Sequence, residues 1–154
     1  MTRSIVIADS SSMMALDNIG ELQILPKLFN QVTVTPEVAG EYGKLLPDWT
    51  IIRSASPRSL QRPEISDLDP GEAASIALAL DYENALVIID EKKGRRVAEQ
   101  LNIEIIGTVG VLIKARIAGF IEDPESILTR LEAVDFRLDD FLRSKLKNRE
   151  DRVH

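Results

Sequence analysis

The chain has 154 residues, of which 44% are hydrophobic, and it carries a formal net charge of -6. This length is enough for one well-buried core and short for two, so we expect a single domain over residues 1–154. The acidic balance argues against a general cationic surface for nucleic acid, and any such contact must therefore be local.

The residue types exclude several kinds of catalytic site. The chain has no Cys, and His154 is its single His. Cys/His zinc sites, a Cys nucleophile and a Ser-His-Asp triad therefore lack their parts. Acid and base chemistry falls to carboxylates, Lys, Tyr or metal-bound water. Oxygen ligands favour Mg²⁺, Mn²⁺ or Ca²⁺ over softer metals.

The N-terminal segment has only a short apolar run before Asp9, which is unlike a signal peptide. No stretch of about 18 uncharged apolar residues is long enough to span a bilayer. We expect a cytoplasmic protein with no membrane partner, and the missing Cys agrees with a reducing compartment.

Short apolar runs alternate with helical patterns along the chain, which is typical of a parallel sheet covered by crossover helices. The predicted strands cover residues 4–8, 31–34, 49–52, 85–89 and 103–106. The predicted helices cover residues 12–19, 22–29, 36–44, 70–82, 92–101, 109–118, 124–133 and 139–147. We expect a three-layer α/β/α domain of Rossmann-like type, with about five parallel strands and C-terminal helices from about residue 124. Residues 53–68 contain two prolines, and we expect a surface loop there.

Two acids, Asp9 and Asp90, directly follow apolar strands. Ligands of open α/β sheets bind at the carboxyl ends of the strands. If these two strands are neighbours at the sheet centre, both carboxylates can reach one cation. The alternative for each acid is a cap of the next helix. Ser11 is placed to hold a carboxylate or a metal-bound water.

Glu72 opens a predicted helix, and its role stays open between ligand and helix cap. The segment from Asp69 to Glu72 has the spacing of a capping box, in which the third helical residue reaches back to the cap residue. The glycine between them, Gly71, weakens a helix start, and this favours a close approach of backbone or ligand.

The densest positive cluster of the chain directly follows Asp90 and consists of Lys92, Lys93, Arg95 and Arg96. Such a run is often a solvated helix face. Beside a metal site, it is also well placed to hold a phosphate backbone.

Glu41 lies in the helical pattern after the second strand, and Glu37 lies one turn before it on the same face. Either residue can serve as a further acid of the site. An exposed Glu on a helix is usually only solvated.

In chain order, these residues resemble the PIN domain, the fold of the VapC-type toxin ribonucleases. The segments that carry the resemblance are IVIADSSSMMAL, LDPGEAASIALAL and ALVIIDEKKGRRVAEQLNIEIIGTVGVLIKA. They are most similar to an uncharacterised prokaryotic PIN-like subfamily, over about residues 4–120. The likeness departs at Glu72, where most PIN nucleases have Asp, and at Ile88, where a hydroxyl residue is common.

The resemblance implies a five-stranded sheet with the first strand at its centre. It implies Mg²⁺ or Mn²⁺ held by Asp9, Glu72 and Asp90, with Glu41 assisting and Ser11 orienting a ligand. The activity it implies is an endoribonuclease that hydrolyses RNA phosphodiester bonds with metal-activated water, with Lys92, Lys93, Arg95 and Arg96 steering the RNA. It further implies the toxin of a type II toxin–antitoxin system, whose partner is a small antitoxin protein.

Two other classes of function are alternatives to this one. One is a PIN-fold interaction module with weak or lost nuclease activity. Its docking face, for a partner or a homodimer, would be Phe136, Leu138, Phe141, Leu142 and Leu146, although such a stripe is more often core packing. The other is a phosphate-handling enzyme or receiver domain, which is disfavoured because the P-loop and G-x-G-x-x-G motifs are missing.

Overall fold

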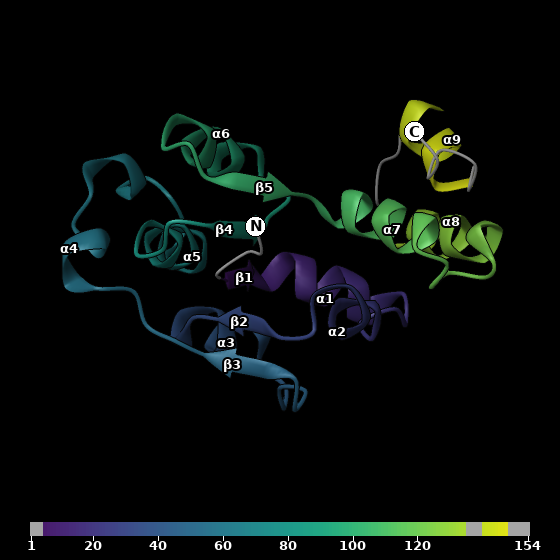
Figure 1. The fold of residues 1–154 in the computed structure, drawn as a ribbon, viewed down its shortest axis with the longest axis horizontal. Coiled ribbons are helices and arrows are strands. Elements are labelled where there is room, and N and C mark those ends of the chain that lie inside the picture. The colour runs from purple at the N-terminus through teal and green to yellow at the C-terminus, as the bar shows by residue number, and fades with distance from the viewer. Residues whose placement is uncertain (1–4, 135–139, 148–154) are drawn as a thin grey trace.

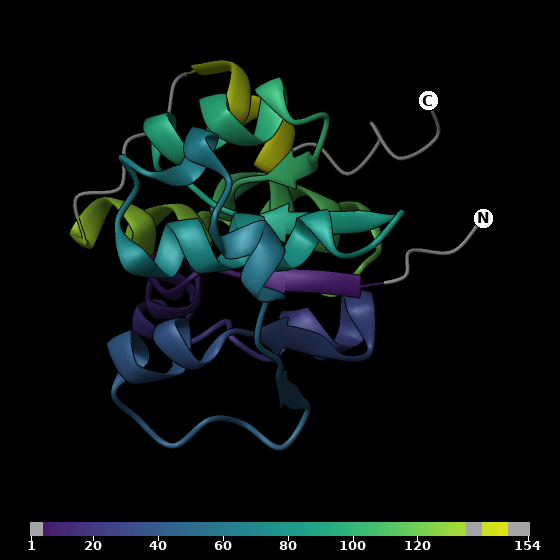
Figure 2. The ribbon, with the colours of Figure 1, turned by 90° about the vertical axis from the view of Figure 1, so that its left-hand side faces the viewer.

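The computed structural model describes residues 5–134 and 140–147, and within these ranges five parallel strands form one sheet. The strands are β1 (Ile5–Ala8), β2 (Val32–Val34), β3 (Thr50–Ile52), β4 (Ala85–Ile88) and β5 (Glu104–Ile106). Their order is β3-β2-β1-β4-β5, so β1 is central, as predicted. In Figure 2, β1 (purple) and β4 (teal) cross the middle of the molecule. The strand order reverses between these two strands, which is where open α/β sheets bind ligands.

Helices follow each strand, and all the predicted ones are present with their ends shifted by a few residues. They are α1 (Ser10–Asn18), α2 (Ile24–Phe29), α3 (Pro36–Tyr42), α4 (Pro57–Leu60), α5 (Pro70–Leu80), α6 (Lys92–Gln100), α7 (Thr108–Ile117), α8 (Pro124–Ala133) and α9 (Asp140–Lys147). Figure 1 shows α5 and α6 on one side of the sheet and α1, α2 and α7 on the other.

The prediction of an irregular loop over residues 53–68 is wrong in part. This segment contains α4 and a short 3-10 helix, Pro63–Ile65. Ser56 caps α4 by accepting a hydrogen bond from the Ser59 N–H at 3.1 Å, and both hydroxyls donate to the Asp81 carboxylate. A helix of one turn leaves no hydrophobic periodicity, so the apolar pattern gave no sign of it.

The three layers follow from the alternation of side chains along β1. Ile5 and Ile7 pack with α5 and α6 on one face, whereas Val6 and Ala8 pack with α1, α2 and α7 on the other. Because successive residues of a strand point to opposite faces, a strand with a core on both sides must be apolar throughout. The predicted three-layer α/β/α arrangement is therefore confirmed.

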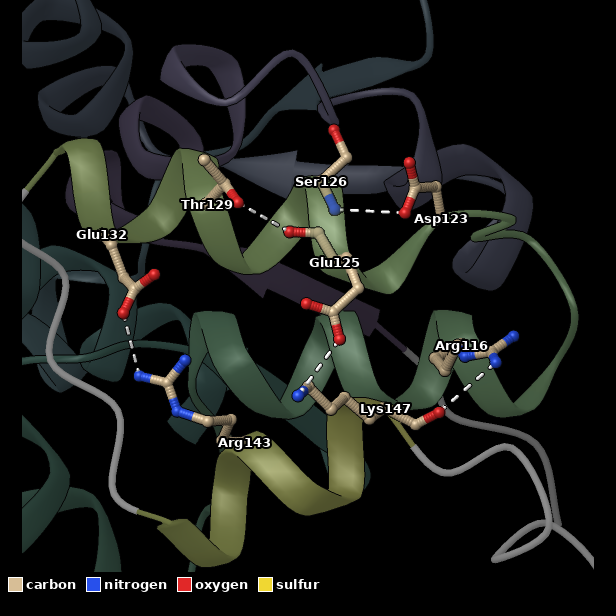
Figure 3. Close-up of polar contacts among 8 residues, drawn as sticks. All are labelled: Arg116, Asp123, Glu125, Ser126, Thr129, Glu132, Arg143 and Lys147. Atoms are coloured by element: carbon tan, nitrogen blue, oxygen red, sulfur yellow. Dashed lines mark hydrogen bonds and ion pairs between the residues drawn. The ribbon is translucent and has the colours of Figure 1, made fainter.

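The C-terminal helices α8 and α9 add to the second of these faces. Leu146 of α9 is fully buried in the same cluster as Val6 and Ala8. Ion pairs of 3.1 Å join the two helices, between Arg143 and Glu132 and between Lys147 and Glu125 (Figure 3). No helix in the described ranges is long and apolar enough to cross a membrane.

The predicted apolar docking face is therefore divided. Leu146 belongs to the core, and Phe141 is 67% exposed. Phe136, Leu138 and the side chain of Leu142 lie outside the part of the chain that the structure describes.

We expect Leu146→Ala to lower the free energy of unfolding by about 2–5 kcal/mol, because it leaves a cavity in the core. Phe141→Ala, on the exposed side of the same helix, is the matched control and should change stability by less than about 0.5 kcal/mol. Urea denaturation of both variants measures the difference, and equal effects would contradict the packing of α9 on the sheet.

Candidate active site

The site lies where β1 and β4 end together. Ala8 pairs with Ile88, and the Asp9 N–H donates to the Ile88 carbonyl at 3.0 Å. Asp9 thus stands one residue beyond β1, and Asp90 stands two residues beyond β4. The carboxyl ends of the two central strands bring both acids to one edge of the sheet.

Three consecutive serines at the start of α1 each contact a different acid. Successive residues of a helix point about 100° apart, so three neighbours can reach three directions. The hydroxyl groups donate hydrogen bonds from Ser10 to Glu41 at 2.7 Å, from Ser11 to Asp9 at 3.2 Å and from Ser12 to Asp90 at 3.2 Å. The first turn of α1 therefore links three of the four predicted acids.

Asp90 is held further by Thr108, which the sequence reasoning missed. The Thr108 N–H donates to Asp90 Oδ1 at 2.8 Å, and its hydroxyl donates to Oδ2 at 2.5 Å. Gly107 allows this approach, because a Cβ there would lie 2.9 Å from Asp90 Oδ1. Ser12 and Thr108 supply the hydroxyl contacts that Ile88 cannot provide. The sequence feature that could have pointed to Thr108 is the pair Gly107-Thr108 directly after the predicted strand over residues 103–106.

Glu41 reaches the site from α3. Its Oε1 accepts from Ser10, and its Oε2 accepts from the Gly71 N–H at 3.1 Å. A Cβ on Gly71 would overlap the Glu41 carboxylate, which explains the glycine at this helix start. Among the described residues, Glu41 makes these hydrogen bonds to the site, and Glu37 makes none of them.

Glu72 makes one of the contacts of the predicted capping box and is also buried near Asp9. The Asp69 N–H donates to its carboxylate, which is one half of a capping box, but the Asp69 side chain makes no cap hydrogen bond. Glu72 is only 8% exposed, and burial raises its pKa to about 7, with further contributions from the charges of Asp9, Asp69 and Glu91. Glu72 is therefore a helix cap whose pKa also responds to the charges of the neighbouring acids.

Asp9 is the most deeply buried acid of the four. It is 2% exposed, and burial raises its pKa to about 6, with smaller contributions from the charges of Glu41 and Asp90. Its Oδ2 accepts from Ser11, whereas Oδ1 is buried without a hydrogen-bond partner among the described residues. An orphaned oxygen on a buried carboxylate is costly unless a proton or a cation reaches it.

The cationic run begins α6 directly after these acids. Lys92, Lys93 and Arg96 are exposed, whereas Arg95 is half-buried and donates from Nη1 to the Ile89 carbonyl at 3.1 Å. Three of the four predicted cations are thus free to meet a ligand from solvent, and Arg95 is partly engaged beside Asp90.

Among the described residues, no three acidic side chains converge closely enough to hold one metal ion as they stand. The chemistry of the donors nevertheless suits a hard cation. Asp9 has an unpartnered buried oxygen, and burial and like charge raise the pKa values of both Asp9 and Glu72. A divalent cation among these oxygens would partner the free oxygen of Asp9 and offset the repulsion between the buried carboxylates.

Comparison with protein families agrees with this geometry. The family model DUF3368, which describes a PIN domain, matches residues 5–151. The chain therefore belongs to this PIN-domain family, and the resemblance to the PIN domain is confirmed. A search of curated proteins found no match, and neither did a search of solved structures. PIN domains are generally nucleases that use divalent metals, so the fold is of nuclease type.

The raised pKa of Asp9 predicts how stability depends on pH. The folded protein holds this proton more tightly than the unfolded chain, so stability falls as the pH rises from about 4 to about 6. Asp9→Asn removes the buried charge. We expect it to stabilise the protein at pH 8 by up to about 3 kcal/mol, from about 1.4 kcal/mol per pKa unit, and to have little effect at pH 3.

Urea denaturation at the two pH values measures this difference in the absence of divalent metal. Glu122→Gln alters an exposed carboxylate outside the site and should leave the pH profile unchanged. An Asp9→Asn protein that is less stable than wild type at pH 8 would contradict the electrostatic strain assigned to Asp9.

Proposed function

We propose that this protein is a metal-dependent endoribonuclease that acts in the cytoplasm as the toxin of a type II toxin–antitoxin pair. The observation that carries the proposal is the buried acidic cluster at the end of β1 and β4, in which Asp9 keeps an unpartnered oxygen. The PIN-domain family supports a nuclease with a nucleic-acid substrate.

The proposed ligands of Mg²⁺ or Mn²⁺ are Asp9, Glu72 and Asp90, with Glu41 assisting. Their side chains must draw closer to share one ion. When bound, a divalent cation lowers the pKa of a water nucleophile and offsets charge on the phosphate. The burial of Asp9 and Glu72 strengthens their attraction for a cation, because water screens them poorly.

The hydroxyls of the site position these acids. Thr108 and Ser12 fix Asp90 through both of its oxygens, and Ser10 fixes Glu41. Hydrogen bonds of this kind orient a ligating carboxylate and limit the entropy lost when the ion binds. Ser11 acts on Asp9 in the same way and leaves Oδ1 available.

The start of α6 is the proposed contact for the RNA backbone. The first turn of this helix contains no acid, and Lys92 and Lys93 stand at its positive end. Cations at a helix N-terminus cost about 0.3–1 kcal/mol each, and a bound phosphate turns this repulsion into attraction. The arrangement explains how an acidic protein can hold RNA locally.

A second candidate is an interaction module without nuclease activity. It is favoured by the lack of any three described acids in metal-binding geometry and by the capping contact of Glu72. Titration calorimetry with Mn²⁺ separates the candidates. The nuclease should bind Mn²⁺ and lose this binding in Asp9→Asn, whereas the module should show no binding that depends on Asp9.

We expect wild-type protein with Mn²⁺ to cleave single-stranded RNA and to stop when EDTA is added. Mutation of a residue that hydrogen-bonds a metal ligand lowers activity about 10–100-fold. Asp9 is a proposed ligand itself, so Asp9→Asn should lower the rate by at least about 100-fold. Glu41→Gln should also lower the rate, whereas Glu37→Gln is the matched control and should leave it unchanged. Equal cleavage by wild type and Asp9→Asn would refute the proposal.

We expect Lys92→Gln combined with Lys93→Gln to weaken RNA binding and to reduce its dependence on salt. Each lost phosphate contact lowers the slope of log affinity against log salt by about 0.7 for single strands. Fluorescence anisotropy at several salt concentrations measures the slope. Lys114→Gln, at an exposed position of α7, should leave the slope unchanged; the same slope in the double variant would exclude α6 from the RNA contact.

A further inference from the structure

A pocket of about 480 Å³ opens directly beside the acidic site. Ser11 and Asp90 line both the pocket and the site. From Ser11 the pocket extends along α1 past Met14 and Ala15 to Asn18. These positions are three and four residues apart and therefore share one face of the helix. The pocket therefore adjoins the acids and runs along one face of α1, where Val134 at the end of α8 also lines it.

The residues around the pocket combine three chemistries. Met14 and Ala15 are half-buried and give an apolar wall, and the Met thioether makes favourable contacts with aromatic ring edges. Asn18 is exposed and offers both a donor and an acceptor. Lys92, which also lines the pocket, offers a positive charge that suits phosphate. An aromatic ring with polar edges and an attached phosphate matches all three.

Glu91 is the remaining charged residue of the pocket, and it narrows the choice of ligand. A carboxylate accepts hydrogen bonds from exocyclic amino groups of bases, as in the contact of Glu with cytosine N4. Uracil has no such amino group. The lining therefore favours cytosine, adenine or guanine over uracil.

We propose that this pocket binds the nucleobase of the nucleotide next to the scissile phosphate, and that it prefers a base with an exocyclic amino group. The assignment of the scissile phosphate rests on the nuclease function proposed above. The phosphate lies toward Asp9 and Asp90, the base lies along Met14 and Ala15, and Lys92 pairs with the adjoining phosphate.

The three methionines of the chain allow a direct test that needs no catalysis. With ¹³C-methyl methionine and EDTA present, CMP, AMP, GMP, UMP and ribose 5-phosphate are titrated in turn. The Met14 signal should shift with CMP, whereas that of the fully buried Met13 should stay in place. UMP should bind about tenfold more weakly than CMP, which corresponds to about 1.4 kcal/mol.

Ala15→Phe fills the pocket and should abolish the Met14 response, and Asn18→Ala should weaken it without disturbing packing. Ala118→Phe, at the exposed alanine that caps the C-terminus of α7 and does not line the pocket, is the matched control and should behave as wild type. In the cleavage assay, Ala15→Phe should raise KM about tenfold for RNA, the equivalent of about 1.4 kcal/mol. An abasic nucleotide beside the cleaved bond should remove the difference between Ala15→Phe and wild type.

Two results would overturn the inference. A Met14 shift as large with ribose 5-phosphate as with CMP would assign the pocket to phosphate alone. A Met14 signal that ignores every nucleotide, together with weaker capture of a partner protein by Ala15→Phe, would assign the pocket to protein docking. Nucleotide binding without RNA cleavage would refute the nuclease function and leave the base pocket standing, so the two failures are distinguishable.

Discussion

Parallel pairing between β1 and β4 is the constraint on which the site depends. The register runs from Ile5 opposite Ala85 to Ala8 opposite Ile88, so both strands end at one level. A slip of one residue would turn Ile5 and Ile7 toward the core that now holds Val6 and Ala8, and the reverse, so the side-chain packing on both faces of the sheet would be lost. The cores on both sides of the sheet therefore fix the register, and the register fixes Asp9 beside Asp90.

The same packing places like charges where water screens them poorly. Asp9 is buried against the end of the sheet, and Glu72 is buried at the start of α5, with a raised pKa at each. Hydroxyls from α1 and α7 donate hydrogen bonds to the carboxylates and lower part of the free energy of burying them. The stability of the large apolar core offsets the rest. A site of this kind trades folding stability for affinity toward a proton or a cation.

Much of this arrangement could be predicted from short-range patterns. Asp9 and Asp90 were predictable because each ends an apolar strand, and parallel strands end at a common edge. Thr108 was missed, because its contact with Asp90 depends on the pairing of β5 with β4, in which Ile106 lies opposite Ile88. The approach of Glu41 to Gly71 likewise joins α3 to α5 across about 30 residues of chain. The one-turn helix α4 depends on side-chain caps and not on periodicity.

A crystal grown with Mn²⁺ tests most directly whether a divalent cation binds among Asp9, Glu72 and Asp90. We expect an anomalous peak at about 2.0–2.2 Å from Asp9 Oδ1, with oxygens of Glu72 and Asp90 drawn toward the same ion. A crystal in which Mn²⁺ binds elsewhere, while Asp9 Oδ1 keeps no ligand, would contradict it.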